Sequence, residues 1–157
     1  VGNQALVLLD ANLQVVATVE ATGDVPEDFE DEDYEPIRDV AVHGDQVIVL
    51  TTDSHAKGSG LRLLDLDGRF LRTIAAGQLT HPWAVAASHG RAFVVDDDDD
   101  SGNVLHVIDL QSGDISQSVR LELHGRVSAM TVDGDEIYIA GFDANEVVVL
   151  QLAGSEA

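Results

Sequence analysis

The chain has 157 residues, a hydrophobic fraction of 45% and a formal net charge of −21, from 29 acidic against 8 basic residues. This length suffices for one domain with a buried core, while such an acidic surface makes nucleic acids and anionic membranes poor partners. Cysteine is absent, which excludes disulfides and thiolate-bound metals, and no apolar run approaches the roughly 20 residues of a membrane span. Aromatic residues are only 4%, so a core of valine, leucine, isoleucine and alanine is expected, which favours β-sheets.

The first predicted element, residues 5–20, contains "LVLLDANLQVVATV". Two short β-branched runs around a turn with Asp and Asn are typical of a hairpin. An acidic segment, "EATGDVPEDFEDEDYEP" from Glu20 to Pro36, follows and carries Phe29 and Tyr34. We favour a hydrated loop here. The alternative is an interaction segment, in which the two aromatic rings anchor a partner and the carboxylates attract its basic surface.

The rest of the chain repeats. "PIRDVAVHGDQVIVLTTD", "HPWAVAASHGRAFVVDDDD" and "RVSAMTVDGDEIYIAGFD" align with Gly44, Gly90 and Gly134 at corresponding positions. A second motif recurs between them, as "LRLLDLDGRFLRTI" and "LHVIDLQSGDISQSV". Each motif reads as a hairpin, so one unit is a four-stranded antiparallel sheet, and a repeat of about 45 residues is typical of a β-propeller blade.

We therefore predict an all-β fold of about three blade equivalents. Residues 36–77 and 82–123 form complete blades, residues 5–20 supply the two outer strands of another, and residues 127–152 supply three strands of a further blade. A closed propeller needs at least about four blades, so additional sequence or a second copy is expected to complete it. The predicted innermost strands contain Val40–Val42, Val85–Ala87 and Ala129–Val132.

The stretch "EPIRDVAVHGDQVIVL", followed by "LRLLDLDGRFLRTIAAG", resembles the NHL-repeat family of propellers. Gluconolactonase-like and YncE-like propellers share much of this pattern. The regular repeats, the acidic segment with its two aromatic residues and the lack of a credible nucleophile favour a rigid platform that binds a protein or peptide. RNA binding, known among NHL propellers, depends on a basic face that this sequence does not have.

In a propeller, the connections between blades and the loops after each second strand lie on one face, where ligands usually bind. This predicted binding face contains Phe29, Tyr34, Asp53, Asp96, Asp97, Asp98, Asp99, Asp100 and Asp143. For the five consecutive aspartates we favour a hydrated turn, because carboxylates on an extended chain alternate in direction and no EF-hand spacing is present. Binding of Ca²⁺ or Mg²⁺ is the alternative.

The alternative to a binding platform is an enzyme, and it depends on two histidines in the connections between blades. His81 and His124, with Asp97 and Asp99, would be the ligands of a metal-dependent propeller lactonase or lyase. We favour the simpler explanation, that both histidines make ordinary hydrogen bonds in turns. No nucleophile motif is present, so a non-catalytic platform without a cofactor is the preferred interpretation. Trp83 is expected to pack between blades rather than stack on a ligand, and Asp10, Asp65 and Asp109 to cap turns.

The charge also predicts adaptation to salt. A domain with a net charge of −21 repels itself, and about 1 M salt shortens the Debye length to about 3 Å. We expect the melting temperature to rise with KCl, beyond the general salting-out effect. Melting curves across a wide KCl range test this, and a flat or falling trend contradicts it.

Overall fold

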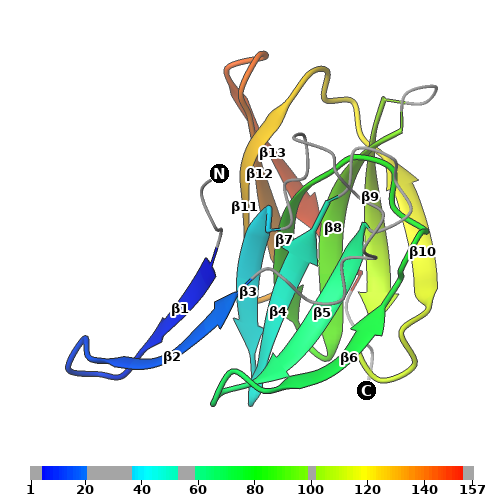
Figure 1. Ribbon diagram of the computed structural model, residues 1–157. Coiled ribbons are helices and arrows are strands. Elements are labelled where there is room, and N and C mark those ends of the chain that lie inside the picture. Colours follow the sequence, from blue (N-terminus) through cyan, green and yellow to red (C-terminus); the bar gives the residue numbers. More distant parts are fainter. Residues whose placement is uncertain (1–4, 21–36, 53–58, 99–101, 154–157) are drawn as a thin grey trace, which may run out of the picture.

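The computed structural model describes residues 5–20, 37–52, 59–98 and 102–153, and these residues form an all-β structure (Figure 1). No helix in these ranges is long and apolar enough to cross a membrane. The strands, in chain order, are β1 (Ala5–Leu9), β2 (Val15–Glu20), β3 (Asp39–His43), β4 (Gln46–Thr51), β5 (Gly60–Asp65), β6 (Phe70–Ile74), β7 (Pro82–Ser88), β8 (Arg91–Asp98), β9 (Gly102–Asp109), β10 (Ile115–Arg120), β11 (Val127–Asp133), β12 (Glu136–Gly141) and β13 (Glu146–Gln151).

The strands form antiparallel sheets in chain order, as expected for propeller blades. Blade I has the order β3-β4-β5-β6 and blade II the order β7-β8-β9-β10. A three-stranded sheet has the order β11-β12-β13, and β1 and β2 form the N-terminal hairpin. The predicted all-β fold of four-stranded blades is confirmed.

The first strand of each sheet lies on the inner side of the arc. β7 is in contact with both β3 and β11, which places these three strands next to one another (Figure 1). The segments predicted to be innermost, Val40–Val42, Val85–Ala87 and Ala129–Val132, belong to these strands. The structure therefore agrees with this part of the sequence interpretation.

The core lies between the sheets, because the blades have two apolar faces. Along β8, Ala92 and Val94 face blade I, whereas Phe93 and Val95 face the three-stranded sheet. This alternation is the two-residue period of a strand. The cluster between blades I and II also contains Ile48, Leu50, Leu61, Leu63 and Ile108, and the cluster on the other face contains Leu105, Leu123, Ile137 and Ile139.

Polar contacts join blade I to blade II at both ends of the sheets. The Asp39 Oδ2 atom accepts a hydrogen bond from the Val85 backbone N–H at 2.9 Å. At the other end of β3, the His43 Nε2 atom accepts one from the Gly90 N–H at 3.0 Å. These contacts fix the inner strands β3 and β7 relative to each other.

Each aspartate predicted to cap a turn does so. The Oδ1 atom of Asp10 accepts hydrogen bonds from the N–H groups two and four residues ahead, and Asp65 does the same. Asp109 accepts from the N–H groups of Gln111 and Ser112. These backbone hydrogen bonds lower the pKa of Asp10 and Asp109, because they stabilise the ionised carboxylate.

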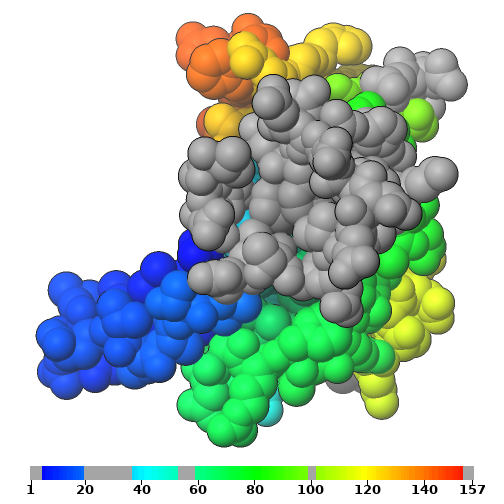
Figure 2. All heavy atoms as spheres, viewed as in Figure 1, coloured from blue at the N-terminus to red at the C-terminus, as the bar shows by residue number. Residues whose placement is uncertain are grey.

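The N-terminal hairpin projects from the body of the molecule (Figure 2). One side of it packs on blade I, where Leu6, Leu8 and Val19 contact a small cluster with Val47 and Leu64. Its other side leaves large apolar residues exposed, namely Val7, Leu9, Val15 and Val16. The hairpin thus contacts blade I as the outer strands of a neighbouring blade would.

Candidate binding pocket at the ends of the inner strands

A pocket of about 360 Å³ opens where the three inner strands begin. It is lined by Ile37, Arg38, Asp39, Trp83, Arg126, Val127, Ser128 and Phe142. These residues come from the starts of β3, β7 and β11 and from the segment after β12. The inner strands meet here because blades I and II and the three-stranded sheet pack side by side.

Two irregularities in the strands contribute to the pocket wall. The pairing register shifts between Pro82 and Ala84 in β7, and between Val127 and Ala129 in β11. The residues in between, Trp83 and Ser128, therefore have no direct partner in the next strand. Such bulges redirect side chains, and they are frequent beside binding sites.

The Arg38 guanidinium stacks on the ring of Trp83, with 4.6 Å between Cζ and the ring centroid. Trp83 is partly buried and also packs on the cluster between blade II and the three-stranded sheet, so the predicted packing between blades is present. Its indole N–H is buried and has no acceptor within the described ranges. A smaller pocket of about 150 Å³ lies beside the same stack and is lined by Arg38, Thr52, His81, Pro82 and Trp83.

A second stacked arginine lies across the pocket. The Arg126 Cζ atom is 4.6 Å from the centroid of the Phe142 ring. Its Nη2 atom donates to Asp143 Oδ1 at 3.1 Å, while its Nε and backbone N–H donate to Oδ2 at 3.4 and 2.8 Å. These contacts lower the pKa of Asp143 and raise that of Arg126, because each charge stabilises the other. Asp143, predicted on the binding face, thus lies next to the pocket and orients Arg126.

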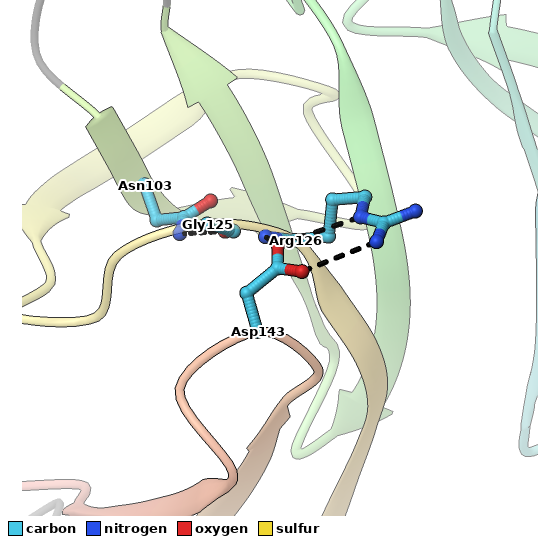
Figure 3. A network of polar contacts seen from close by, with 4 residues as sticks. All are labelled: Asn103, Gly125, Arg126 and Asp143. Atoms are coloured by element: carbon cyan, nitrogen blue, oxygen red, sulfur yellow. Dashed lines mark hydrogen bonds and ion pairs between the residues drawn. The ribbon is translucent and has the colours of Figure 1, made fainter.

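Asn103 of blade II holds the backbone that precedes Arg126 (Figure 3). Asn103, only 2% exposed, donates from Nδ2 to the carbonyl oxygens of Leu123 and Gly125, each at 2.7 Å. Gly125 has a φ of +82°, and a Cβ atom there would lie 2.6 Å from the Asp143 Oδ2 atom. A side chain at this position is therefore excluded on two grounds, and the backbone before Arg126 is held in place.

The run of aspartates differs from the prediction of a hydrated turn. Strand β8 continues through Asp98, and Asp96 is 1% exposed. The Asp96 carboxylate accepts hydrogen bonds from the Thr80 N–H at 2.8 Å and the His81 N–H at 2.7 Å. Asp96 is thus an internal anchor for the connection that leads into Trp83, because its carboxylate satisfies backbone donors there. It presents no surface to a partner.

Other predicted site residues are only partly described. Asp97 and Asp98 lie at the end of β8, partly buried, and the Asp97 N–H donates to the His81 carbonyl at 3.1 Å. His124 is exposed in the connection between β10 and β11. Five predicted residues lie outside the described residues: Phe29, Tyr34, Asp53, Asp99 and Asp100.

The proposed metal ligands are not brought together in the part of the chain that the structure describes. Within residues 5–20, 37–52, 59–98 and 102–153, no group of three or more histidine, aspartate or glutamate side chains is arranged to hold a metal ion. His81, His124 and Asp97 belong to these ranges, whereas Asp99 does not. The metal-dependent enzyme therefore gains no support from the described geometry.

Blade II contains a row of three polar side chains, Ser118, His106 and Asp96, that the order of residues in the sequence did not reveal. The Ser118 Oγ and His106 Nδ1 atoms are 2.8 Å apart, and His106 Nε2 is 3.5 Å from the Asp96 Oδ2 atom. The three residues lie on neighbouring strands and face the same side of the sheet. Both oxygens of Asp96 already accept backbone hydrogen bonds, from the N–H groups of Thr80 and His81. We therefore assign a structural role to this row of side chains.

None of the eight residues that line the pocket was among the predicted site residues, and the two arginines, Arg38 and Arg126, are the most informative of those missed. The available signal was positional, since both arginines occur directly before or at the start of a predicted inner strand. Basic residues are rare in this chain, which contains seven arginines and one lysine, Lys57, against 29 acidic residues. That rarity, combined with the equivalent positions in the repeat, could have indicated the site.

The comparisons with known proteins support the fold. No protein-family model matches the sequence, and neither does any curated protein. Among solved structures, hydrazine synthase from Kuenenia stuttgartiensis matches with a TM-score of 0.59 and 14% identity, over 82% of this chain and 36% of that chain. The chain thus spans about a third of the length of that protein chain.

Two further matches have lower TM-scores. AztD from Citrobacter koseri has a TM-score of 0.47 and 19% identity, over 73% of this chain and 43% of that chain. A chain of the nidogen/laminin complex has a TM-score of 0.45 and 13% identity, over 87% of this chain and 64% of that chain. At these identities the similarity concerns the fold alone. The chain has a β-propeller-like fold that corresponds to part of larger propellers.

Proposed function

We propose that this chain is a non-catalytic propeller platform, of the NHL type suggested by its repeats, that binds a protein or peptide. The observation that carries the proposal is the pocket where the inner strands begin. Trp83 and two arginines lie on its wall, and tryptophan and arginine are enriched among residues that dominate binding energy in interfaces. The pocket also lies on the face that carries the blade connections.

The charge of the chain suggests how a partner approaches. A net charge of −21 attracts basic segments over long distances, and Asp97 and Asp98 lie at the same end of the blades as the pocket. We therefore expect the partner to be basic overall, with a local contact in the pocket. Since the chain corresponds to about a third of the hydrazine synthase chain that it matches, we also propose that it is a module of a larger propeller.

The test is selection of peptides from a phage-displayed random library against the purified protein. Recovered peptides should bind Phe142→Ala and Trp83→Ala at least about tenfold more weakly, as hot-spot truncation requires. Phe142 is 63% exposed, so its replacement leaves the core intact, and melting temperatures establish the fold of both variants.

The matched control is Phe70→Ala, which removes another exposed ring, on the outer strand β6. It should bind the peptides like the wild type. Failure to enrich any peptide, or recovery of peptides that bind the two pocket variants as tightly as the wild type, contradicts the proposal.

A further inference from the structure

Strands β1, β5, β9 and β13 hold equivalent positions in four successive sheets. The first three end at the turn aspartates Asp10, Asp65 and Asp109, and β13, like β5 and β9, is the third strand of its sheet. Apolar residues of each strand pack toward the next: Leu6 and Leu8 of β1 on Leu64 of β5, Leu61 and Leu63 of β5 beside Ile108 of β9, and Leu105 and Val107 of β9 beside Val148 and Leu150 of β13. One kind of contact between neighbouring sheets therefore occurs three times in the chain.

The three-stranded sheet leaves the corresponding face exposed. In β13, Val147 and Val149 alternate with the two residues that pack on blade II, so they point to the opposite side of the sheet. By strand pairing they correspond to Leu105 and Val107 of blade II. Leu105 and Val107 are buried beneath the three-stranded sheet, whereas Val147 and Val149 are 62% and 52% exposed. The face that receives a neighbouring sheet in blade II is thus open in the three-stranded sheet.

The N-terminal hairpin exposes the complementary face. Val7 and Leu9 alternate with Leu6 and Leu8 along β1 and therefore point away from blade I. Leu9 directly precedes a turn aspartate and so holds the position that Leu64 holds in blade I. Leu64 is covered by the hairpin, whereas Val7 and Leu9 are 48% and 50% exposed. The row of sheets thus begins with a face of the kind that packs onto a preceding sheet.

These two faces carry no charge at the positions that correspond to the contacts within the chain. The residues and their cross-strand partners are Val7 with Thr18 and Leu9 with Val15 in the hairpin, and Val147 with Ala140 and Val149 with Tyr138 in the three-stranded sheet. In a chain with a net charge of −21, exposed apolar areas of this kind indicate interaction sites. A basic partner gains no ion pair at these positions, whereas the apolar face that fits β13 is present on β1 of every copy of the chain.

We propose that the exposed face of β13 packs on the exposed face of β1 in a second copy of the chain, which repeats between chains the contact seen three times within one. A two-fold axis generates this contact twice and closes the pair. Each copy has four sheets, so two copies place four and four, or eight, sheets around one axis, within the range of about four to eight blades in propellers. The inference goes beyond the peptide-binding platform and specifies the proposed larger propeller as an assembly of two copies.

Electrostatic repulsion opposes this contact and decides the conditions of the test. Two copies with a net charge of −21 each repel one another at low salt, and about 1 M KCl shortens the Debye length to about 3 Å. Burial of the apolar faces remains favourable under these conditions. Light scattering coupled to size exclusion, at micromolar protein and about 1 M KCl, is therefore expected to give the mass of two chains.

Val149→Asp tests whether the face of β13 makes the contact. It should raise the dissociation constant of the pair at least about a hundredfold, because an unpaired carboxylate would be buried in both contacts. Leu66→Asp is the matched control, since Leu66 is 51% exposed in the turn between β5 and β6, and it should keep the mass of two chains. Both side chains are exposed in the single chain, so both variants are expected to fold, and circular dichroism verifies it.

Cross-linking tests which faces meet. The chain has no cysteine, so Leu9→Cys and Val149→Cys each introduce a single thiol. A short bismaleimide that bridges the roughly 10 Å between packed sheets should join the two variants when they are mixed. Neither variant should be joined to itself, because each face meets the other face and not its own copy. A mixture of Leu66→Cys with Val149→Cys is the control and should give no product.

A mass of two chains that Val149→Asp abolishes, together with a product in the Leu9→Cys and Val149→Cys mixture alone, supports the inference. The mass of one chain at every KCl concentration overturns it. A product from Val149→Cys by itself also overturns it, since β13 would then meet β13. A mass above two chains shows contacts that do not close into a pair and overturns the two-copy assembly. The peptide selection concerns the pocket at the start of the inner strands, so each of these results leaves the platform to be decided separately.

Discussion

Replacing Phe93 with alanine is expected to lower the free energy of unfolding by about 3–5 kcal/mol. Phe93 is fully buried in β8 and belongs to the cluster between blade II and the three-stranded sheet. Alanine leaves a cavity there, because strands held by ladders on both sides cannot close around the missing ring. Neighbouring members of the cluster are Leu105, Ile137 and Ile139.

Urea unfolding monitored by circular dichroism measures this effect. Phe70→Ala is the control, because Phe70 is 61% exposed and its loss should change stability by about 0.5 kcal/mol or less. If Phe93→Ala were as stable as Phe70→Ala, the contact between blade II and the three-stranded sheet would not be part of the stable core. The chain would then be expected to unfold in separate steps.

The second large effect concerns Asp96. Asp96→Asn is expected to lower the free energy of unfolding by about 2–4 kcal/mol, although it removes one negative charge from a very acidic chain. The two oxygens of Asp96 accept hydrogen bonds from different N–H groups, those of Thr80 and His81. Asparagine offers one oxygen and one NH₂ group, so one backbone donor would face another donor in a buried place.

Asp97→Asn provides a comparison of the same chemistry one residue along β8. We expect it to change stability by about 0.5 kcal/mol or less, since Asp97 is only partly buried. Trp83 fluorescence should shift in Asp96→Asn and not in Asp97→Asn, because Thr80 and His81 lead directly into β7. Equal and small effects of the two substitutions would show that Asp96 belongs to a hydrated turn, as the sequence alone suggested.

Several features of the fold could be predicted because they depend on local pattern. The repeated strands with Gly44, Gly90 and Gly134 in their turns indicated the blades. The turn aspartates were predictable for the same reason, since Asp10 and Asp109 bind backbone groups within a few residues of themselves.

The pocket could not be predicted in this way. Arg38, Trp83, Arg126 and Phe142 come from three different sheets, and each arginine stacks on a ring whose position depends on how those sheets pack. The Arg38–Trp83 stack, for example, needs β3 and β7 side by side, at a spacing that Asp39 and Val85 help to fix. Only the contact between blades decides which side chains converge.

By itself, the sequence determined the all-β class, the four-stranded units and their order, because a two-residue period and turn chemistry act over a few residues. It also determined the acidic surface, since charge is a sum over composition. Tertiary structure alone decided that Asp96, the first of five identical residues, is buried while Asp97 and Asp98 are only partly so. The physical reason is that its carboxylate accepts hydrogen bonds from the backbone N–H groups of Thr80 and His81, about fifteen residues earlier, and burial of a carboxylate is favourable only where such donors replace water.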